Sequence, residues 1–501
     1  MQQLSGLDSS FVYLETPRTP MNIGGIYIFD GNTPSGQMNF ERFKEHIRSR
    51  LHVARAFRQR LIDVPLNLDF PYWIEDPDFE LDLHLPHVGL PQPGDRQALM
   101  KLAADIFSKP LDRSRPLWEI TFVDGLDKIE GVPKHAFAAI CKIHHAAVDG
   151  VAGEEILSAL LDVFPKPRIV EETSAWTPQS VPTEIEVLGK TYSSAIRSPF
   201  RFAKLLRQTS SMIATSISTR LTARFRSPPM ILSAPKSCFD ATLSAQRVID
   251  GTQISLERVK LIKNAIPGAT VNDVVLAVCS GALRKYLLDK DALPEESLVS
   301  LAPISIRSLN EKGDAGNRIS AMLVSLATDE PDPLTRMVRI NESTRGAKEY
   351  NKAIEAERLM DYLPSATFSL AVRLYTRWHL SDKHNPFFNL VTTNVPGPQI
   401  PLYLDGAKLL TQVGIAPIFD GMGLSIVIMS YAGNIGIGAI SCKTLMPDLS
   451  ALIAHIEDAM KELEHALKIE RPTDSEEEPN LKAERTVKAV KSVKKSEAAA
   501  S

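Results

Sequence analysis

The chain has 501 residues, of which 44% are hydrophobic and 23% charged, a composition typical of a globular protein with two or three domains. Its 57 basic and 60 acidic residues give a formal net charge of -3, which argues against a dedicated nucleic-acid binder. The four cysteines, Cys141, Cys238, Cys279 and Cys442, are too widely spaced for a zinc ribbon or a CxxC redox pair, so we expect them to be reduced.

The order of segments along the chain predicts an α/β protein with two domains. Residues 1–165 mix strands and helices and form the predicted first domain, which begins without the features of a secretory signal. Residues 166–239 open with a stretch rich in Pro, Ser, Thr and Glu and are predicted to be a linker and connector. Residues 240–469 form the predicted second domain, with helices at 272–288 and 449–467, and residues 470–501 a disordered charged tail. We expect the protein to be cytoplasmic.

One uncharged stretch, residues 421–441, is long enough to span a membrane, but it contains five glycines and Asn434. Its two halves, residues 424–429 and 435–440, are rich in Ile or Val and flank a turn. The pattern therefore favours a buried β-hairpin over a membrane-spanning helix.

The connector contains a basic stretch, residues 187–239, with nine basic side chains and no acidic one. Apolar residues alternate with these charges, a pattern that suits amphipathic helices lying on an anionic membrane surface or a lipid droplet. A solvated helical connector packed on the two domains explains the same pattern. Both interpretations stay open at this point.

The segment HAFAAICKIHHAAVDG, residues 135–150, predicts a strand, a tight turn and the start of a helix. Alternation along the strand places His145 at the end of an apolar row and His144 in the row that contains Lys142. Burial disfavours the charged form of an imidazole, so His145 is predicted to be a neutral general base. Asp149 is expected to brace the turn, either as a helix cap or as the partner of an arginine, and Gly150 to form the turn. A satisfied core histidine beside a surface histidine is the simpler alternative, and a metal site is disfavoured because adjacent strand residues point to opposite faces.

His144-His145-Ala-Ala-Val-Asp149-Gly150 resembles the H-H-x-x-x-D-G signature of the CoA-dependent acyltransferase superfamily, which includes chloramphenicol acetyltransferase and peptide-synthetase condensation domains. Six further motifs occur in the order typical of one family within it: LSGLDSSF with ETP and PM (residues 4–21), RPLWE (115–119), VNDVV (271–275), PISIR (303–307), GNRIS (316–320) and TNVPGP leading to PLY (393–403). Together they resemble the bacterial wax ester synthase/diacylglycerol acyltransferases over residues 1–468.

The resemblance implies transfer of a long-chain acyl group from acyl-CoA to a fatty alcohol or a diacylglycerol. It also implies two chloramphenicol-acetyltransferase-like domains, each a mixed sheet with flanking helices, and an active-site tunnel at their interface. In this family pattern His145 matches the catalytic base, His144 its neighbour, Asp149 the structural acid and Gly150 the turn. Acyl-CoA is a substrate, and no cofactor or metal is expected because a thioester is already electrophilic and one imidazole suffices as base. The implied partners are these lipids and an anionic membrane surface or lipid inclusion, to which the protein would attach peripherally.

Two other motifs place polar residues near helix and strand ends. Asn272 and Asp273 begin the predicted helix, where they cap its N-terminus or, for Asn272, act as a polar donor in the active site. Asn394 ends a predicted strand before the VPGP turn, and its motif match makes a place beside the tunnel the alternative.

The remaining candidates are substrate-binding or supporting residues. Trp118 begins a predicted strand at residues 119–123 and either fills the core or contacts substrate. Arg307 closes a predicted strand at residues 298–306 and is a candidate partner for Asp149, with solvent exposure as the alternative. Asn317 lies in a Gly-containing loop that is expected to contact the CoA or acyl part of the donor.

Two other functions remain open on the residues. A condensation-type or polyketide-type acyltransferase would use the same histidine, but the chain has none of the carrier-protein domains that adjoin condensation domains. A non-catalytic acyl-binding scaffold would have no reason to keep both histidines and Asp149. An esterifying acyltransferase of neutral lipid synthesis is therefore the favoured prediction.

Overall fold

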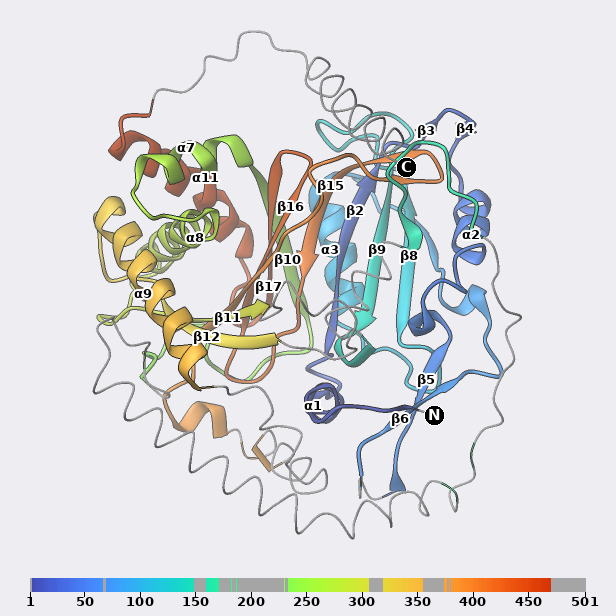
Figure 1. The fold of residues 1–501 in the computed structure, drawn as a ribbon, viewed down its shortest axis with the longest axis horizontal. Helices are drawn as coiled ribbons and strands as arrows, with labels where there is room; N and C mark the ends of the chain where they lie inside the picture. Colours follow the sequence, from blue (N-terminus) through green and yellow to red (C-terminus); the bar gives the residue numbers. More distant parts are fainter. Residues whose placement is uncertain are drawn as a thin grey trace, which may run out of the picture.

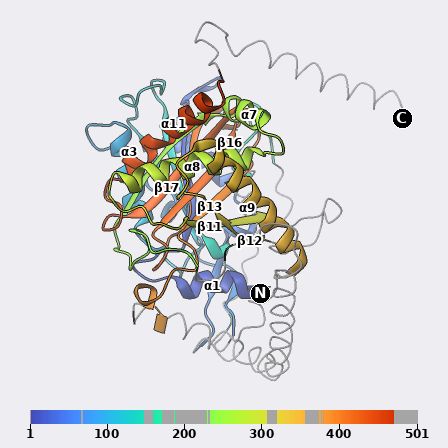
Figure 2. The ribbon, with the colours of Figure 1, turned by 90° about the vertical axis from the view of Figure 1, so that its left-hand side faces the viewer.

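The computed structural model describes residues 2–65, 69–147, 159–170, 182, 186, 229, 233–305, 319–354, 374, 375, 378 and 380–469. Within these residues the chain forms two large mixed β-sheets with helices packed on them (Figure 1). The turned view shows α8, α9 and α11 in front of the second sheet (Figure 2). The predicted α/β class with two mixed sheets is confirmed.

The first sheet has the strand order β14-β15-β2-β9-β8-β7. Its strands are β2 (Asn22–Phe29), β7 (His87–Gly89), β8 (Trp118–Asp124), β9 (Phe137–His144), β14 (Tyr403–Leu404) and β15 (Ala407–Ile415). All pairs are antiparallel except β7 with β8. Every residue of β9 is buried, because both faces of the sheet are covered.

The predicted alternation along β9 is confirmed. Phe137 and Ala139 belong to a cluster with helix α2 (Phe40–Arg48), whereas Ala138 and Ile140 belong to a cluster with helix α3 (Arg96–Phe107) on the opposite face. Alternate side chains of β9 thus pack into two different hydrophobic clusters, one on each face of the sheet.

The second sheet has the order β10-β17-β16-β13-β11-β12. Its strands are β10 (Arg247–Ser255), β11 (Val299–Ser305), β12 (Ile319–Ser325), β13 (Leu390–Val395), β16 (Leu424–Tyr431) and β17 (Asn434–Cys442). The strand β13 runs parallel to both of its neighbours, and the other pairs are antiparallel. The hairpin of β16 and β17 confirms the predicted hairpin and leaves no span in this stretch. No helix in the described parts of the chain is both long and apolar enough to cross a membrane.

Helices α7 (Leu256–Ala265), α8 (Val271–Leu288), α9 (Pro333–Ile354) and α11 (Leu449–Ala466) lie on the outer side of the second sheet, away from the first (Figure 1). The predicted helices at residues 272–288 and 449–467 are α8 and α11. The buried face of α8 forms the largest hydrophobic cluster with α11 and the sheet.

The strand β15 crosses from the second half of the chain into the first sheet, where it pairs with β2. It packs against β17 so closely that a Cβ on Gly438 would lie 2.1 Å from the carbonyl oxygen of Gly414. Ile26 of β2, Val413 of β15 and Ile440 of β17 share one hydrophobic cluster, so the two halves have a common core. The linear division into residues 1–165, 166–239 and 240–469 did not anticipate this exchange.

The remaining described elements are short, apart from α1. They are α1 (Gly6–Leu14), the small sheet β1 (Gln2–Gln3), β6 (Tyr72–Glu75) and β5 (Gln59–Ile62), the pair β3 (Asn32–Thr33) and β4 (Gly36–Gln37), and the short 3-10 helices η1 (Arg55–Phe57), η3 (Leu81–Leu83), η4 (His145–Ala147) and η7 (Leu380–Lys383). Nearly all of the basic stretch and the whole tail 470–501 lie outside the described residues.

Candidate functional site

The two histidines mark the point where β9 ends. His144 is its last residue and pairs with Asn22 of β2, whereas His145 begins the 3-10 helix η4. The backbone N–H of His145 donates to the carbonyl of Met21 at 2.8 Å. The prediction that His145 continues the apolar row of the strand is therefore wrong, because the backbone turns between the two residues.

The ring of His145 is partly buried and lies against the side chain of Phe11. Their ring centroids are 3.7 Å apart and the planes differ by 16°. Helix α1, which carries Phe11, is capped by Ser5, whose hydroxyl accepts the N–H of Asp8 at 3.0 Å. Burial lowers the pKa of His145 to about 4, although its own backbone carbonyl raises that pKa in part, and His144 lowers it further. The ring is therefore neutral near pH 7 and able to accept a proton, while its role as general base stays a prediction.

His144 is the more deeply buried of the pair, with 1% of its surface exposed. Its Nδ1 accepts the backbone N–H of Ala146 at 3.1 Å, so in the neutral ring the proton is on Nε2. This Nε2 lies 3.5 Å from Oε1 of Glu15, which also accepts the backbone N–H of Met21 at 3.3 Å. One set of contacts therefore links the two histidines: His144 faces Glu15, Glu15 accepts the N–H of Met21, and Met21 accepts the N–H of His145. Lys142, which precedes His144 in the same row of β9, is buried as well.

Glu15 and Phe11 are residues for which the sequence suggested no role. Both lie in the N-terminal motif that supported the family resemblance. The motif therefore pointed to this segment but not to what these two side chains contact. Their contacts with the histidines join residues more than one hundred positions apart, which local patterns do not report.

Two predicted site residues meet between strand β13 of the second sheet and the start of helix α8. The amide nitrogen of Asn394, near the end of β13, donates to Oδ1 of Asn272 at 2.9 Å. The residue that caps α8 is Thr270, so the capping role considered for Asn272 is wrong. Its side chain instead accepts a hydrogen bond from Asn394, and its role as a polar donor in the active site stays a prediction.

Asp273 has the structural role predicted for it. It completes a capping box with Thr270 and is 1% exposed. It also accepts hydrogen bonds from Nδ2 of Asn341 at 2.8 Å and from the hydroxyl of Thr344 at 2.7 Å, both on α9. Asp273 thus joins the start of α8 to a second helix.

Trp118 fills the core of the first half. Its indole is 2% exposed, donates from Nε1 to the carbonyl of Phe57 at 3.0 Å, and stacks on His84 at a centroid distance of 4.5 Å. The core interpretation of Trp118 therefore fits its surroundings. Asp149, Gly150, Arg307 and Asn317 lie outside the described residues.

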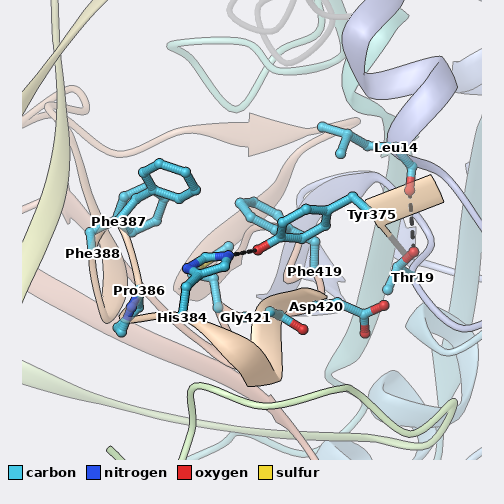
Figure 3. A pocket seen from close by; sticks show the side chains of 12 residues that line it. Leu14, Thr19, Tyr375, His384, Pro386, Phe387, Phe388, Phe419, Asp420 and Gly421 are labelled. Carbon is cyan, nitrogen blue, oxygen red and sulfur yellow. Dashed lines mark hydrogen bonds between the residues drawn. The ribbon is translucent and has the colours of Figure 1, made fainter. Parts of the chain in front are cut away.

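A cavity of about 150 Å³ lies between the end of α1 and loops of the second half (Figure 3). Its apolar wall consists of Leu14, Pro386, Phe387, Phe388, Phe419 and Met422. Across the described ranges, no group of three or more His, Cys, Asp or Glu side chains is arranged to bind a metal ion.

Comparison with known proteins places this geometry in a family. The wax ester synthase/diacylglycerol acyltransferase catalytic domain matches residues 4–275, and the C-terminal domain of the same family matches residues 315–464. The chain belongs to the wax ester synthase/diacylglycerol acyltransferase family. It is therefore an acyltransferase, as the seven motifs predicted.

The similarity to individual members of this family extends over nearly the whole chain. A Mycobacterium tuberculosis protein assigned as a diacylglycerol O-acyltransferase is 34% identical over 470 residues, covering 92% of this chain and 90% of its own. The O-acyltransferase WSD of Acinetobacter baylyi is 33% identical over 467 residues, covering 92% and 96%. The solved wax ester synthase/diacylglycerol acyltransferase of Marinobacter aquaeolei superposes with a TM-score of 0.66 at 26% identity, covering 93% of this chain and 100% of that one.

The starter condensation domain of rhizomide synthetase superposes with a TM-score of 0.52 at 14% identity, covering 93% and 94% of the two chains. This similarity shows the shared fold alone.

Proposed function

We propose that this acyltransferase moves a long-chain acyl group from acyl-CoA to the hydroxyl of a fatty alcohol or a diacylglycerol, with His145 as general base. The observation that carries the proposal is the state of His145: its pKa is lowered to about 4, its ring is stacked on Phe11, and its backbone is bonded to Met21. The names of the Mycobacterium and Marinobacter relatives, a diacylglycerol O-acyltransferase and a wax ester synthase/diacylglycerol acyltransferase, support the choice of acceptors.

In this reaction the neutral imidazole removes the proton of the alcohol as the alcohol oxygen attacks the thioester carbonyl. The C–O bond forms, the tetrahedral intermediate collapses with cleavage of the C–S bond, and the imidazolium returns the proton to the CoA thiolate. Ester and free CoA are the products, and neither an oxidant nor a covalent enzyme intermediate is needed. The proposal therefore includes no cofactor and no metal.

Glu15 and His144 have positioning roles in this proposal. The Nε2–H of His144 faces Glu15, and the same carboxylate holds the segment to which the backbone of His145 is bonded. Proton transfer needs a donor–acceptor distance near hydrogen-bond length, so a displaced backbone at His145 reduces the rate.

The test is a substrate matrix with purified protein. Labelled palmitoyl-CoA is offered with hexadecanol or with dioleoylglycerol, and the esters formed are separated and counted. The wild-type protein should form ester with at least one acceptor, and His145→Ala should reduce the rate by about a hundredfold to ten-thousandfold without changing the circular dichroism spectrum. A His145→Ala protein that retains more than about a tenth of the rate contradicts the assignment of the base.

We also propose that the protein attaches peripherally to the inner membrane face or to lipid inclusions through the basic stretch. Nine basic side chains without an acidic one between residues 187 and 239 support this proposal. Attachment would bring the enzyme to substrates that are dissolved in lipid.

A further inference from the structure

The turn segment runs from Glu15 to Met21, the two residues that contact the histidines of the site. Between them, Thr16 and Thr19 pair as an antiparallel bridge, and their hydroxyl oxygens lie 2.7 Å apart. Arg18 lies at the tip of the resulting tight turn. Contacts that fix this tip therefore also fix the residues on which the proposed base depends.

The tip of the turn segment is held by the second half of the chain. One guanidinium nitrogen of Arg18 donates to the carbonyl of Leu243 at 3.4 Å, and another lies 3.6 Å from Oδ2 of Asp420. The carbonyl of Arg18 accepts a hydrogen bond from the guanidinium of Arg247. Asp420 is joined to the same region, since its Oδ1 accepts the N–H of Leu243 at 2.9 Å. Thr19 of the turn and Asp420 line one cavity, where the two halves meet (Figure 3).

The carboxylate of Asp420 is buried, with 7% of the residue exposed. Among the described residues its Oδ2 has no hydrogen-bond partner, although Arg18 faces it. Burial lowers the pKa of Arg247 to about 10, while Cys442 and Asp420 raise that pKa in part, so Arg247 is positively charged near pH 7. A buried carboxylate that loses a cationic neighbour is destabilised, so Asp420 and Arg18 hold each other in place.

We propose that Arg18 and Asp420 are positioning residues, through which the second half of the chain holds the turn segment and thereby the orientation of His145. The inference rests on the proposed function and adds residues of the second half to the support of the base. Neither residue contacts the reacting atoms. They act through Glu15 and Met21, which keep the histidines in place only while the turn between them is fixed. Because proton transfer is sensitive to small displacements, a loosened turn lowers the rate.

The first test compares substitutions at the two residues by steady-state kinetics with palmitoyl-CoA and hexadecanol or dioleoylglycerol. Arg18→Gln and Asp420→Asn each remove one charge and keep a polar side chain, and each should lower kcat by about tenfold to a hundredfold with little change in KM for palmitoyl-CoA. Arg18→Lys keeps the positive charge and should retain more activity than Arg18→Gln. The double variant should lose no more than about twofold beyond the more severe single variant, because the two side chains act through each other.

A second measurement follows His145 itself. A loosened turn segment should expose its imidazole to water, so in Arg18→Gln and Asp420→Asn the acid limb of kcat/KM should move from about pH 4 toward 6.5. An NMR titration of histidine-labelled protein, with the signal of His145 assigned from His145→Gln, should show the same shift without turnover. A role confined to stability would lower the melting temperature and leave both measurements unchanged.

The matched control is the ion pair of Arg42 and Asp405, which also joins the two halves, at 2.7 Å. Arg42 belongs to α2, and Asp405 lies in the turn between β14 and β15, so neither is part of the turn segment. Arg42→Gln should lower the melting temperature and leave kcat and the titration of His145 at their wild-type values. A loss of kcat in this control equal to that in Arg18→Gln would overturn the specific role of Arg18.

The outcomes separate this inference from the proposed function. If the wild-type protein forms no ester from palmitoyl-CoA but the titration of His145 shifts in the variants of Arg18 and Asp420, the proposed reaction fails and the positioning role stands. If ester is formed and Arg18→Gln and Asp420→Asn keep the wild-type kcat and pH profile, the positioning role is overturned. Should Asp420→Asn not fold, Arg18→Gln decides alone, because the side chain of Arg18 is 38% exposed and its loss leaves the core intact.

Discussion

The ring of Phe11 lies flat on the ring of His145, with their centroids 3.7 Å apart. An aromatic face on one side restricts the orientation of the imidazole and excludes water from it. Both effects serve a base that must stay neutral and aligned with the alcohol. The substitution Phe11→Leu should therefore reduce kcat by about tenfold to a hundredfold, with a small effect on stability.

The control for Phe11 is Phe40, which stacks on His87 at a centroid distance of 4.7 Å in a different part of the first half. Phe40→Leu removes an equivalent stack and should leave kcat unchanged. Steady-state kinetics on both variants, with thermal unfolding to check the fold, decides the matter. Equal activity in the two variants would remove Phe11 from the site.

The lowered pKa of His145 predicts how activity and stability respond to acid. Because the pKa is about 4 in the folded protein against an ordinary value of 6.5, kcat/KM should stay level as the pH falls through 6.5 and decline only as it approaches about 4. Between about pH 6.5 and pH 4 this residue is protonated in the unfolded chain but neutral in the folded protein. Each unit by which the pH falls in this range therefore lowers the free energy of unfolding by about 1.4 kcal/mol.

The stability part of this prediction is measured against a variant without the group. His145→Gln should lose less melting temperature than the wild type between about pH 7 and pH 5, since glutamine does not titrate. Parallel loss in both proteins, or an activity decline centred near 6.5, would show that the imidazole is solvated.

Glu15→Gln tests the contact between Glu15 and His144. Glutamine can still accept the N–H of Met21, but it removes the negative charge that faces Nε2–H of His144. We expect kcat to fall about tenfold with little change in melting temperature, because the loss is one of positioning. The control Glu464→Gln breaks an ion pair with Arg258, at 2.6 Å, and should lower stability without affecting kcat. Wild-type kcat in Glu15→Gln would leave the carboxylate with a structural role only.

Asp273 and Asn272 should give opposite results although they are adjacent. In Asp273→Asn an amide group that donates hydrogen bonds replaces a carboxylate oxygen, and it faces groups that are themselves donors. The substitution should therefore destabilise the protein by about 1–3 kcal/mol, seen as a lower melting temperature. Asn272→Ala, which removes the contact with Asn394, should leave the melting temperature unchanged and alter kcat or KM. A stable Asp273→Asn protein would show that the capping box is dispensable.

The basic stretch predicts binding to anionic liposomes, measured by flotation. Charge reversal should weaken flotation and slow turnover of membrane-embedded diacylglycerol more than turnover of detergent-dispersed hexadecanol, because surface attraction is worth about 1 kcal/mol per basic residue. The substitutions are Arg201→Glu, Lys204→Glu, Arg207→Glu and Arg224→Glu. Raised salt should have the same effect, since screening acts over about 10 Å at 0.1 M. Unchanged flotation would favour the solvated connector.

The sequence by itself determined the features that depend on neighbouring residues. The alternation of β9, the hairpin of β16 and β17, the helix from residue 272 to 288 and the order of the motifs all follow from spacings of a few positions, where the backbone period decides which side chains share a face. The same local pattern predicted that His145 is neutral. The pattern extended the strand one residue too far, to His145. A strand period does not show where the strand ends and the 3-10 helix begins.

Only the tertiary structure decided which distant residues complete the site. Glu15 reaches His144, Phe11 reaches His145 and Asn394 reaches Asn272 across more than one hundred residues of chain. The strand β15 enters the first sheet from the second half for the same reason: its glycine at 414 permits a close approach to β17, and its other edge satisfies the backbone of β2. Such pairings are selected by packing and by hydrogen bonds between segments that meet only in the folded chain.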